Sequence, residues 1–136
     1  STINRQPTTQ KMLNKGLRDE ESIRIENTLK TLHALVFVPK LDNEDFLAID
    51  EQLKGFGLNI EKISEIPKDE LIQLIQRCHL DWEQQERFAD ILVQMSQQNQ
   101  FHFLEKAIAI YNYIQTESKM FSFGINTKLT AAKAKL

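Results

Sequence analysis

Apolar residues recur at steps of three and four positions along most of this chain, which is the spacing of residues on one face of an α-helix. The first stripe follows Asp19, a residue type that caps helices, and stops before Pro39, which cannot continue one. This stripe consists of Ile25, Leu29, Leu32 and Val36. A shorter stripe follows Asp42 and consists of Phe46, Ile49 and Leu53. The two segments therefore predict a helical hairpin.

The middle of the chain predicts one short helical turn and two further helices. Gly55 is expected to end the second helix, and an apolar connector with a helical turn follows it: Leu58, Ile60, Ile63 and Ile66. Pro67 is expected at the first helical position of the next segment, whose apolar face is Leu71, Leu74, Ile75 and Cys78. Asp81 and Gln84 have the spacing of a capping box, in which each side chain bonds the backbone N–H of the other residue. They predict a helix that buries Phe88, Ile91, Leu92 and Met95.

The strongest period in the chain follows a polar break at residues 96–100. It predicts a helix whose apolar face is Leu104, Ala107, Ile108, Tyr111 and Ile114. Residues 118–123 interrupt the pattern, and residues 126–136 predict a last helix with only a narrow apolar face. No stretch alternates apolar and polar residues as a half-buried strand does. We therefore predict an all-α fold, a compact bundle of about five or six helices.

The length of 136 residues is typical of one domain with one hydrophobic core. Residues 1–18 are polar and mildly basic without a sustained apolar period, so we expect a flexible polar arm there and a single helical domain over residues 19–136. The arm lacks the apolar run of a secretory signal, and no apolar run in the sequence is long enough to span a bilayer. The lone cysteine, Cys78, cannot form an internal disulfide. These features favour a cytoplasmic protein, and the frequent Lys, Ile, Asn and Gln are typical of an AT-rich bacterial genome.

Residues with obvious chemistry are sparse. Cys78 and His79 are adjacent, but neighbours on a helix point about 100° apart, which does not place the imidazole against the thiol. His33 and His102 have no metal-ligating residue at the spacings of a zinc site. Most paired carboxylates fall in first helical turns, where the helix dipole explains them, and the Gly-Phe-Gly of residues 55–57 lacks the rest of a phosphate loop. We expect no enzyme activity, no cofactor and no metal, although an acid–base pair of residues distant in sequence stays open.

Aromatic residues gather in the C-terminal third of the chain. Six of them are candidate partner contacts: Phe101, Phe103, Tyr111, Tyr113, Phe121 and Phe123. Tyr111 and Tyr113 face different sides of one helix, so one of them is a candidate contact residue. A stacking platform for single-stranded nucleic acid needs interleaved basic residues, and this stretch has only Lys106 and Lys119. A helix-turn-helix built from residues 67–78 and 81–95 would turn an acidic second helix toward the phosphates, which would repel it.

The segment Phe88-Ala89-Asp90-Ile91-Leu92, followed by Leu104-Glu105-Lys106-Ala107-Ile108-Ala109-Ile110-Tyr111, resembles the paired helices of a tetratricopeptide repeat. With Lys68-Asp69-Glu70-Leu71-Ile72 and Thr116-Glu117-Ser118-Lys119-Met120-Phe121-Ser122-Phe123, the last two-thirds of the chain resembles a family of uncharacterised bacterial repeat-like helical proteins. The resemblance implies a tetratricopeptide-like helical hairpin in the C-terminal half and a scaffold whose groove binds a peptide, a protein or a second copy. Arrays usually need about three repeats, so the rest of the chain must complete the core or a second subunit must cover it.

These patterns predict a protein–protein interaction or scaffold module with a protein or peptide partner, and a homodimer stays open. The alternative is a small ligand-binding helical bundle, or an enzyme without a recognisable motif, which would show a closed polar pocket. The formal net charge of −2 provides no field that would attract nucleic acid or an anionic membrane, so neither is an expected partner.

Overall fold

The computed structural model describes the backbone of residues 2–98 and 101–136, and the side chains of residues 19–98 and 101–136. Within these ranges the chain forms seven α-helices, one 3₁₀-helix and no strand, which confirms the all-α prediction. The elements are α1 (Thr2–Val36), α2 (Asn43–Leu53), η1 (Lys54–Phe56), α3 (Ile60–Glu65), α4 (Lys68–Arg77), α5 (Trp82–Met95), α6 (Leu104–Glu117) and α7 (Phe123–Ala134). The described residues thus form more α-helices than the five or six predicted. One of them is α3, which is the short helical turn expected in the apolar connector.

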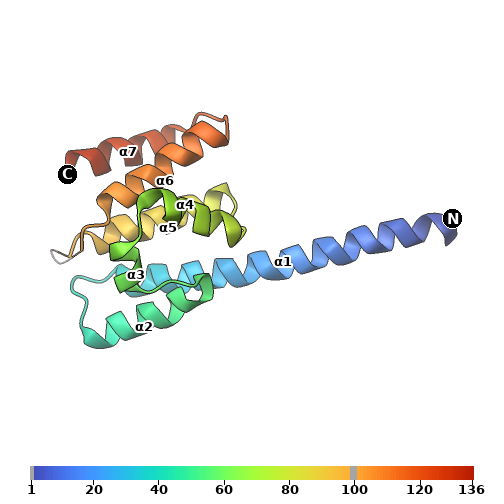
Figure 1. Ribbon diagram of the computed structural model, residues 1–136, viewed down its shortest axis with the longest axis horizontal. Coiled ribbons are helices and arrows are strands. Elements are labelled where there is room, and N and C mark those ends of the chain that lie inside the picture. The colour runs from blue at the N-terminus through green and yellow to red at the C-terminus, as the bar shows by residue number, and fades with distance from the viewer. Residues whose placement is uncertain (1, 99–100) are drawn as a thin grey trace.

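Helix α5 lies at the centre of the bundle, with α1 on one side and α6 on the other (Figure 1). Helix α7 packs along α6, α4 also packs on α6, and α2 packs on α1 and leads into α3. The contact between α1 and α2 confirms the predicted helical hairpin. No helix in the described part of the chain combines the length and apolar character needed to cross a bilayer.

Helix α1 starts earlier than predicted. It runs without a break from Thr2 to Val36, so the helix start expected at Asp19 is wrong. Figure 1 shows the N-terminal half of α1 extending beyond the rest of the bundle. An N-cap residue type such as Asp19 begins a helix only where the backbone before it is not helical, and Gly16 lowers helix stability by only about 1 kcal/mol. The predicted flexible arm, residues 1–18, lies outside the range whose side chains the structure describes.

The first hairpin buries the stripe that the sequence predicts. Ile25, Leu29, Leu32 and Val36 are all buried. Asp42 caps α2 through a capping box with Asp45, whose side chain accepts from the Asp42 N–H at 3.0 Å. The prediction that Gly55 ends this helix is wrong, because the chain continues through η1. Helix α2 ends at Leu53, and Gly57 ends η1 with φ of 72°, a left-handed conformation that costs glycine little.

The capping box that the sequence predicts for α5 is present. The Asp81 carboxylate accepts from the Gln84 N–H at 2.8 Å, and the Gln84 side chain accepts from the Asp81 N–H at 2.9 Å. Pro67 is the N-cap of α4 rather than its first helical residue, so the predicted start is one position early. Its ring still lies where a missing N–H leaves no helical hydrogen bond unmade.

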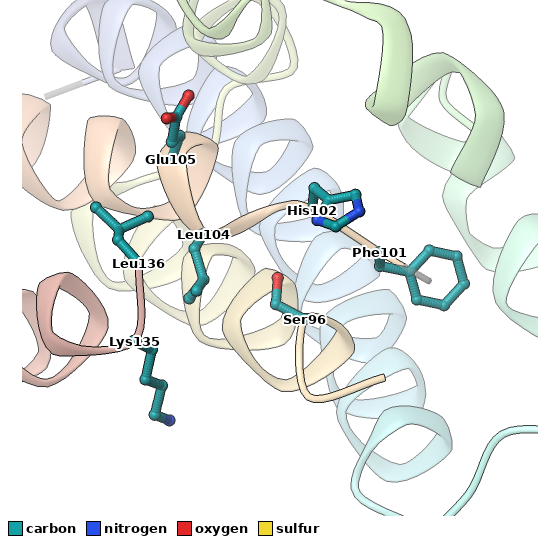
Figure 2. Close-up of a pocket in the computed structure, with 7 residues that line it drawn as sticks. All are labelled: Ser96, Phe101, His102, Leu104, Glu105, Lys135 and Leu136. Carbon is teal, nitrogen blue, oxygen red and sulfur yellow. The ribbon is translucent and has the colours of Figure 1, made fainter. Parts of the chain in front are cut away.

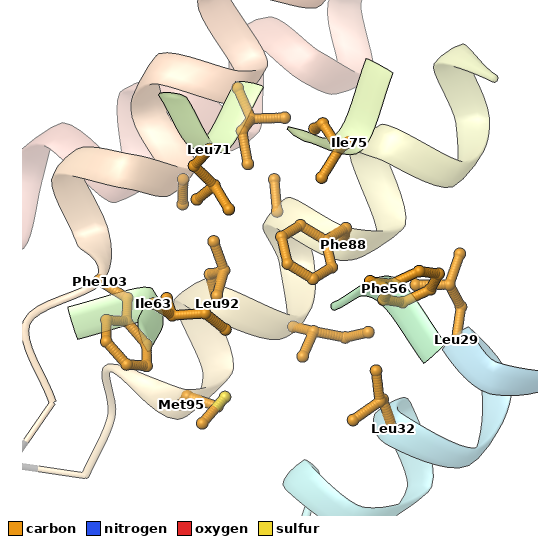
Figure 3. Packing of buried hydrophobic residues seen from close by; sticks show 14 of the residues in the cluster. Leu29, Leu32, Phe56, Ile63, Leu71, Ile75, Phe88, Leu92, Met95 and Phe103 are labelled. Atoms are coloured by element: carbon orange, nitrogen blue, oxygen red, sulfur yellow. The ribbon is translucent and has the colours of Figure 1, made fainter. Parts of the chain in front are cut away.

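One continuous hydrophobic core holds the helices together, and α5 contributes to it from Phe88 to Met95. Figure 3 shows Phe88, Leu92 and Met95 of α5 among side chains of α1, η1, α3, α4 and the residue before α6. The neighbouring residues drawn there are Leu29, Leu32, Phe56, Ile63, Leu71, Ile75 and Phe103. Ile110 of α6 is also fully buried, a position that the predicted apolar face of this helix omits. Residues of α5, α6 and α7 that lie outside this core are the ones that can contact a partner.

Candidate surface for protein contacts

Two of the six candidate contact residues belong to the core. Phe103 and Tyr111 are 0% and 1% exposed, respectively. They present no surface to a partner, because neighbouring helices cover both rings. We therefore correct the prediction for these two residues.

Phe101 and Tyr113 are half-buried and pack against other aromatic rings. The Phe101 ring stacks on Phe103 with 5.4 Å between centroids and meets Phe46 edge-on at 5.5 Å. Tyr113 lies 6.0 Å from the ring of Trp82, which is 39% exposed. The expectation that Tyr111 and Tyr113 face different sides is confirmed, since one is buried and the other reaches the surface. Both rings therefore pack within the bundle, and neither is a prominent surface contact.

The remaining two aromatic residues lie where α6 leads into α7: Phe121 is in the connection and Phe123 is the first residue of α7. We call residues 118–123 the aromatic loop. Phe121 is 67% exposed and Phe123 is 80% exposed, and their rings meet edge-on with centroids 4.9 Å apart. Met120 is 73% exposed and was missed by the sequence analysis, although it directly precedes Phe121. Single exposed apolar residues are common, but a contiguous group of this kind marks a candidate contact surface.

Hydrogen bonds hold the backbone of the aromatic loop in place. The Gln115 amide clamps Ser122, because its Nε2 donates to the Ser122 carbonyl at 3.1 Å and its Oε1 accepts from the Ser122 N–H at 3.1 Å. The Ser122 hydroxyl accepts from the Ile125 N–H at 3.2 Å and so caps α7. Ser118 Oγ accepts from the Met120 N–H at 3.3 Å. The loop thus presents its apolar side chains from a defined backbone conformation.

One residue of this loop has an unfavourable backbone conformation. Lys119 has φ of 57°, in the left-handed region that costs a residue with a Cβ about 1–2 kcal/mol. Such conformations persist where surrounding contacts enforce them, and they concentrate at binding sites. The loop shape is therefore retained at a measurable cost in stability.

A polar cluster ties α7 to α5 and α6. The Tyr111 hydroxyl donates to Asp90 Oδ1 at 2.5 Å, and Lys128 Nζ donates to Asp90 Oδ2 at 2.9 Å and also to Glu86. Burial alone would lower the pKa of Lys128, but its bonds to Glu86 and Asp90 raise it above the ordinary value. Burial and the Asp90 carboxylate raise the pKa of Tyr111. Tyr111 and Lys128 therefore both stay protonated at neutral pH, so neither can accept a proton as a general base.

Cys78 and His79 do not form a catalytic pair in the structure. The Cys78 thiol donates to the Phe56 carbonyl at 3.7 Å, whereas the His79 ring turns to Glu21, with 2.9 Å between Nδ1 and Oε1. Burial raises the pKa of Cys78, Arg77 lowers it and Glu21 raises it, with a net increase. The thiol is therefore a poor nucleophile at neutral pH. Among the described residues, no group of three or more His, Cys, Asp or Glu side chains could hold a metal ion.

Two grooves of the bundle are candidate ligand sites. Figure 2 shows one of about 450 Å³, lined by Ser96, Phe101, His102, Leu104, Glu105, Lys135 and Leu136. The charged ends of Glu105 and Lys135 point in opposite directions there. The Ser96 hydroxyl donates to the Leu92 carbonyl at 2.9 Å and accepts from the Phe103 N–H at 3.1 Å. This groove lacks the convergent polar groups that fix a small ligand.

A second groove, of about 460 Å³, lies where α1 passes the start of α5. Its carboxylates have structural roles, since Glu21 pairs with His79 and Asp81 caps α5. Ser22 Oγ accepts from Gln84 Nε2 at 3.1 Å. The bonds of Glu21 and Ser22 link α1 to the α4–α5 connection and to α5, so these groups have structural roles.

No protein-family model, curated protein or solved structure matches this chain. The resemblance to a tetratricopeptide repeat therefore stays a prediction.

Proposed function

We propose that this protein is a protein–protein interaction module that holds its partner through the aromatic loop. The observation that carries the proposal is the combination of exposed Met120, Phe121 and Phe123 with a backbone clamped by Gln115. Burying a large apolar side chain contributes about 1.5–3 kcal/mol, so burial of three such side chains can supply a large part of the binding free energy. A preformed loop also loses less conformational entropy on binding than a flexible one.

The packing of α5 against α6 supports a scaffold role. These two helices contact each other directly, and each contributes a fully buried alanine, Ala89 and Ala107. Small residues allow close approach of antiparallel helices, as in the tetratricopeptide-like hairpin that we propose for this pair. The hairpin in turn positions the aromatic loop at one end of the bundle, next to the start of α7 (Figure 1).

The test compares capture of cellular proteins by tagged full-length variants in the native host, quantified by mass spectrometry. The loop variant is Phe121→Ser with Phe123→Ser. The control is Leu47→Ser, which removes a side chain of similar exposure, 72%, from α2. We expect a stoichiometric partner with the wild-type chain and the control, and a loss of at least about tenfold with the loop variant. An unchanged partner in the loop variant would overturn the proposal.

Light scattering of the pure protein separates the two kinds of protein partner. A monomer that captures a host protein supports a separate partner. A dimer that the loop variant dissociates supports a second copy in the same role. A protein that captures nothing in stoichiometric amount and stays monomeric contradicts the interaction module.

A further inference from the structure

The charges of this chain are divided unevenly along its length. All 19 acidic residues precede Ser118, and the segment from Ser118 to Leu136 contains four lysines and no acidic residue. This segment comprises the aromatic loop and α7, and we call it the basic segment. The exposed apolar group of the aromatic loop therefore lies in a segment of net positive charge, within a chain whose net charge is −2.

Three of the four lysines in the basic segment are exposed. Lys128 is held between Glu86 and Asp90 and serves the polar cluster. Lys119, Lys133 and Lys135 are exposed, and no carboxylate among the described residues lies within ion-pair distance of them. Their charges are available to a partner without breaking a bond inside the protein.

The apolar and charged groups have a defined arrangement along α7. This helix buries Ile125, Leu129 and Ala132 against the bundle. Its exposed side begins with Phe123 and continues with small or polar residues, Thr127, Thr130 and Ala134. Lys119 lies beside the apolar group, and Lys133 lies about 15 Å along the helix from Phe123. The surface thus has an apolar knob, formed by Met120, Phe121 and Phe123, with Lys119 next to it in sequence and Lys133 and Lys135 at the far end of α7.

We propose that the partner of the aromatic loop is a separate protein with an apolar pocket rimmed by acidic side chains. This proposal rests on the proposed function and adds the chemistry of the partner. Complementary charge steers the encounter and sets specificity, while burial of Met120, Phe121 and Phe123 supplies most of the affinity. A bilayer is a poorer fit, because an interfacial helix needs a continuous apolar stripe and α7 exposes only one large apolar residue. Nucleic acid is also a poorer fit, because the knob presents apolar rings where phosphates would lie.

The first test uses labelled random copolymers as probes, measured by fluorescence anisotropy with the full-length protein. Poly(Glu,Tyr) imitates an acidic apolar surface, and poly(Lys,Tyr) has the same aromatic ring with opposite charge. The charge variant replaces Lys119, Lys133 and Lys135 with Gln. The matched control replaces three exposed lysines that precede the basic segment, Lys30, Lys40 and Lys68, with Gln.

We expect poly(Glu,Tyr) to bind at about 50 mM salt and to bind at least about tenfold more weakly to the charge variant, with little change in the control. Salt of about 300 mM should remove most of this difference, because exposed charges are screened. Equal losses in the charge variant and the control would overturn the proposal. So would stronger binding to poly(Lys,Tyr), or tighter binding to vesicles of phosphatidylcholine and phosphatidylserine than to poly(Glu,Tyr).

The second test places the charge variant in the host capture experiment. We expect it to retain clearly less of the partner than the Lys30, Lys40 and Lys68 control does. A partner that is lost with Phe121→Ser and Phe123→Ser but retained fully by the charge variant would leave the interaction module standing and overturn this inference. A dimer of the pure protein that the charge variant dissociates would make a second copy the partner and overturn the proposal of a separate protein.

Discussion

The Tyr111 hydroxyl and the Asp90 carboxylate form a 2.5 Å hydrogen bond between α6 and α5. The other Asp90 oxygen accepts from Lys128, so the same carboxylate also reaches α7. Helix α7 buries only three residues, Ile125, Leu129 and Ala132, and has little apolar surface to hold it. Hydrogen bonds to a charged group contribute about 1.5–3 kcal/mol, so this cluster is a substantial part of the docking of α7.

The raised pKa values of Tyr111 and Lys128 predict loss of stability in alkaline solution. In the unfolded chain these groups lose their protons near pH 10.0 and 10.5, their ordinary values, whereas the folded state holds the protons more tightly. Their contribution is therefore complete below about pH 10 and falls as the pH rises toward the folded pKa values. We expect urea denaturation to show a falling free energy of unfolding above about pH 10. The Tyr111→Phe variant should show a shallower fall, and an equally steep fall would contradict the role of this hydroxyl.

His79 is expected to be a suboptimal residue at the end of α4. It has φ of 66°, and it forms a turn in which its N–H bonds the Gln76 carbonyl at 3.0 Å and the Leu80 N–H bonds the Ile75 carbonyl at 3.3 Å. This position in a helix end favours glycine. The pair between His79 and Glu21 is exposed and contributes little. We expect His79→Gly to raise the free energy of unfolding by about 0.5–1 kcal/mol in urea.

A Glu21→Gln variant serves as the control for this prediction. It removes the charge of the pair and keeps the backbone of residue 79. We expect a change within about 0.5 kcal/mol. A loss of stability in both variants would show that the pair, rather than the backbone, dominates at this site.

Gln115→Ala is expected to loosen the aromatic loop. The variant removes the clamp on Ser122 and leaves the apolar side chains in place. Hydrogen exchange at the Ser122 amide should become faster, and the free energy of unfolding should fall by about 1 kcal/mol. Thr116→Ala alters an exposed neighbour on the same helix and should leave this exchange unchanged. An unchanged Ser122 amide in Gln115→Ala would show that other contacts set the loop conformation.

Two phenylalanine sites should separate folding from binding. Phe88 is fully buried, so Phe88→Ala should lower the free energy of unfolding by about 3–5 kcal/mol. Phe121 and Phe123 are exposed, so the loop variant should change it by no more than about 0.5 kcal/mol. Thermal or urea denaturation measures both effects. A strongly destabilised loop variant would mean that these rings support the fold, and its loss of a partner would then have another cause.

The sequence by itself determined most local structure of the described chain. The stripe of Ile25, Leu29, Leu32 and Val36 and the capping box of Asp81 and Gln84 involve residues within a few positions of one another, so the spacing alone predicts them. Local signals were less decisive at boundaries. Asp19 suits a helix cap but lies inside α1, and Gly57 rather than Gly55 adopts the left-handed turn.

The tertiary structure alone decided which aromatic residues reach the surface. Phe103 and Phe121 look alike in the sequence, but one is fully buried and the other is exposed, because burial depends on helices distant along the chain. The bond between Tyr111 and Asp90 joins positions 21 residues apart and carries no spacing signal. Contacts of this kind appear only after α5, α6 and α7 pack together, and the same packing leaves the aromatic loop exposed at one end of the bundle.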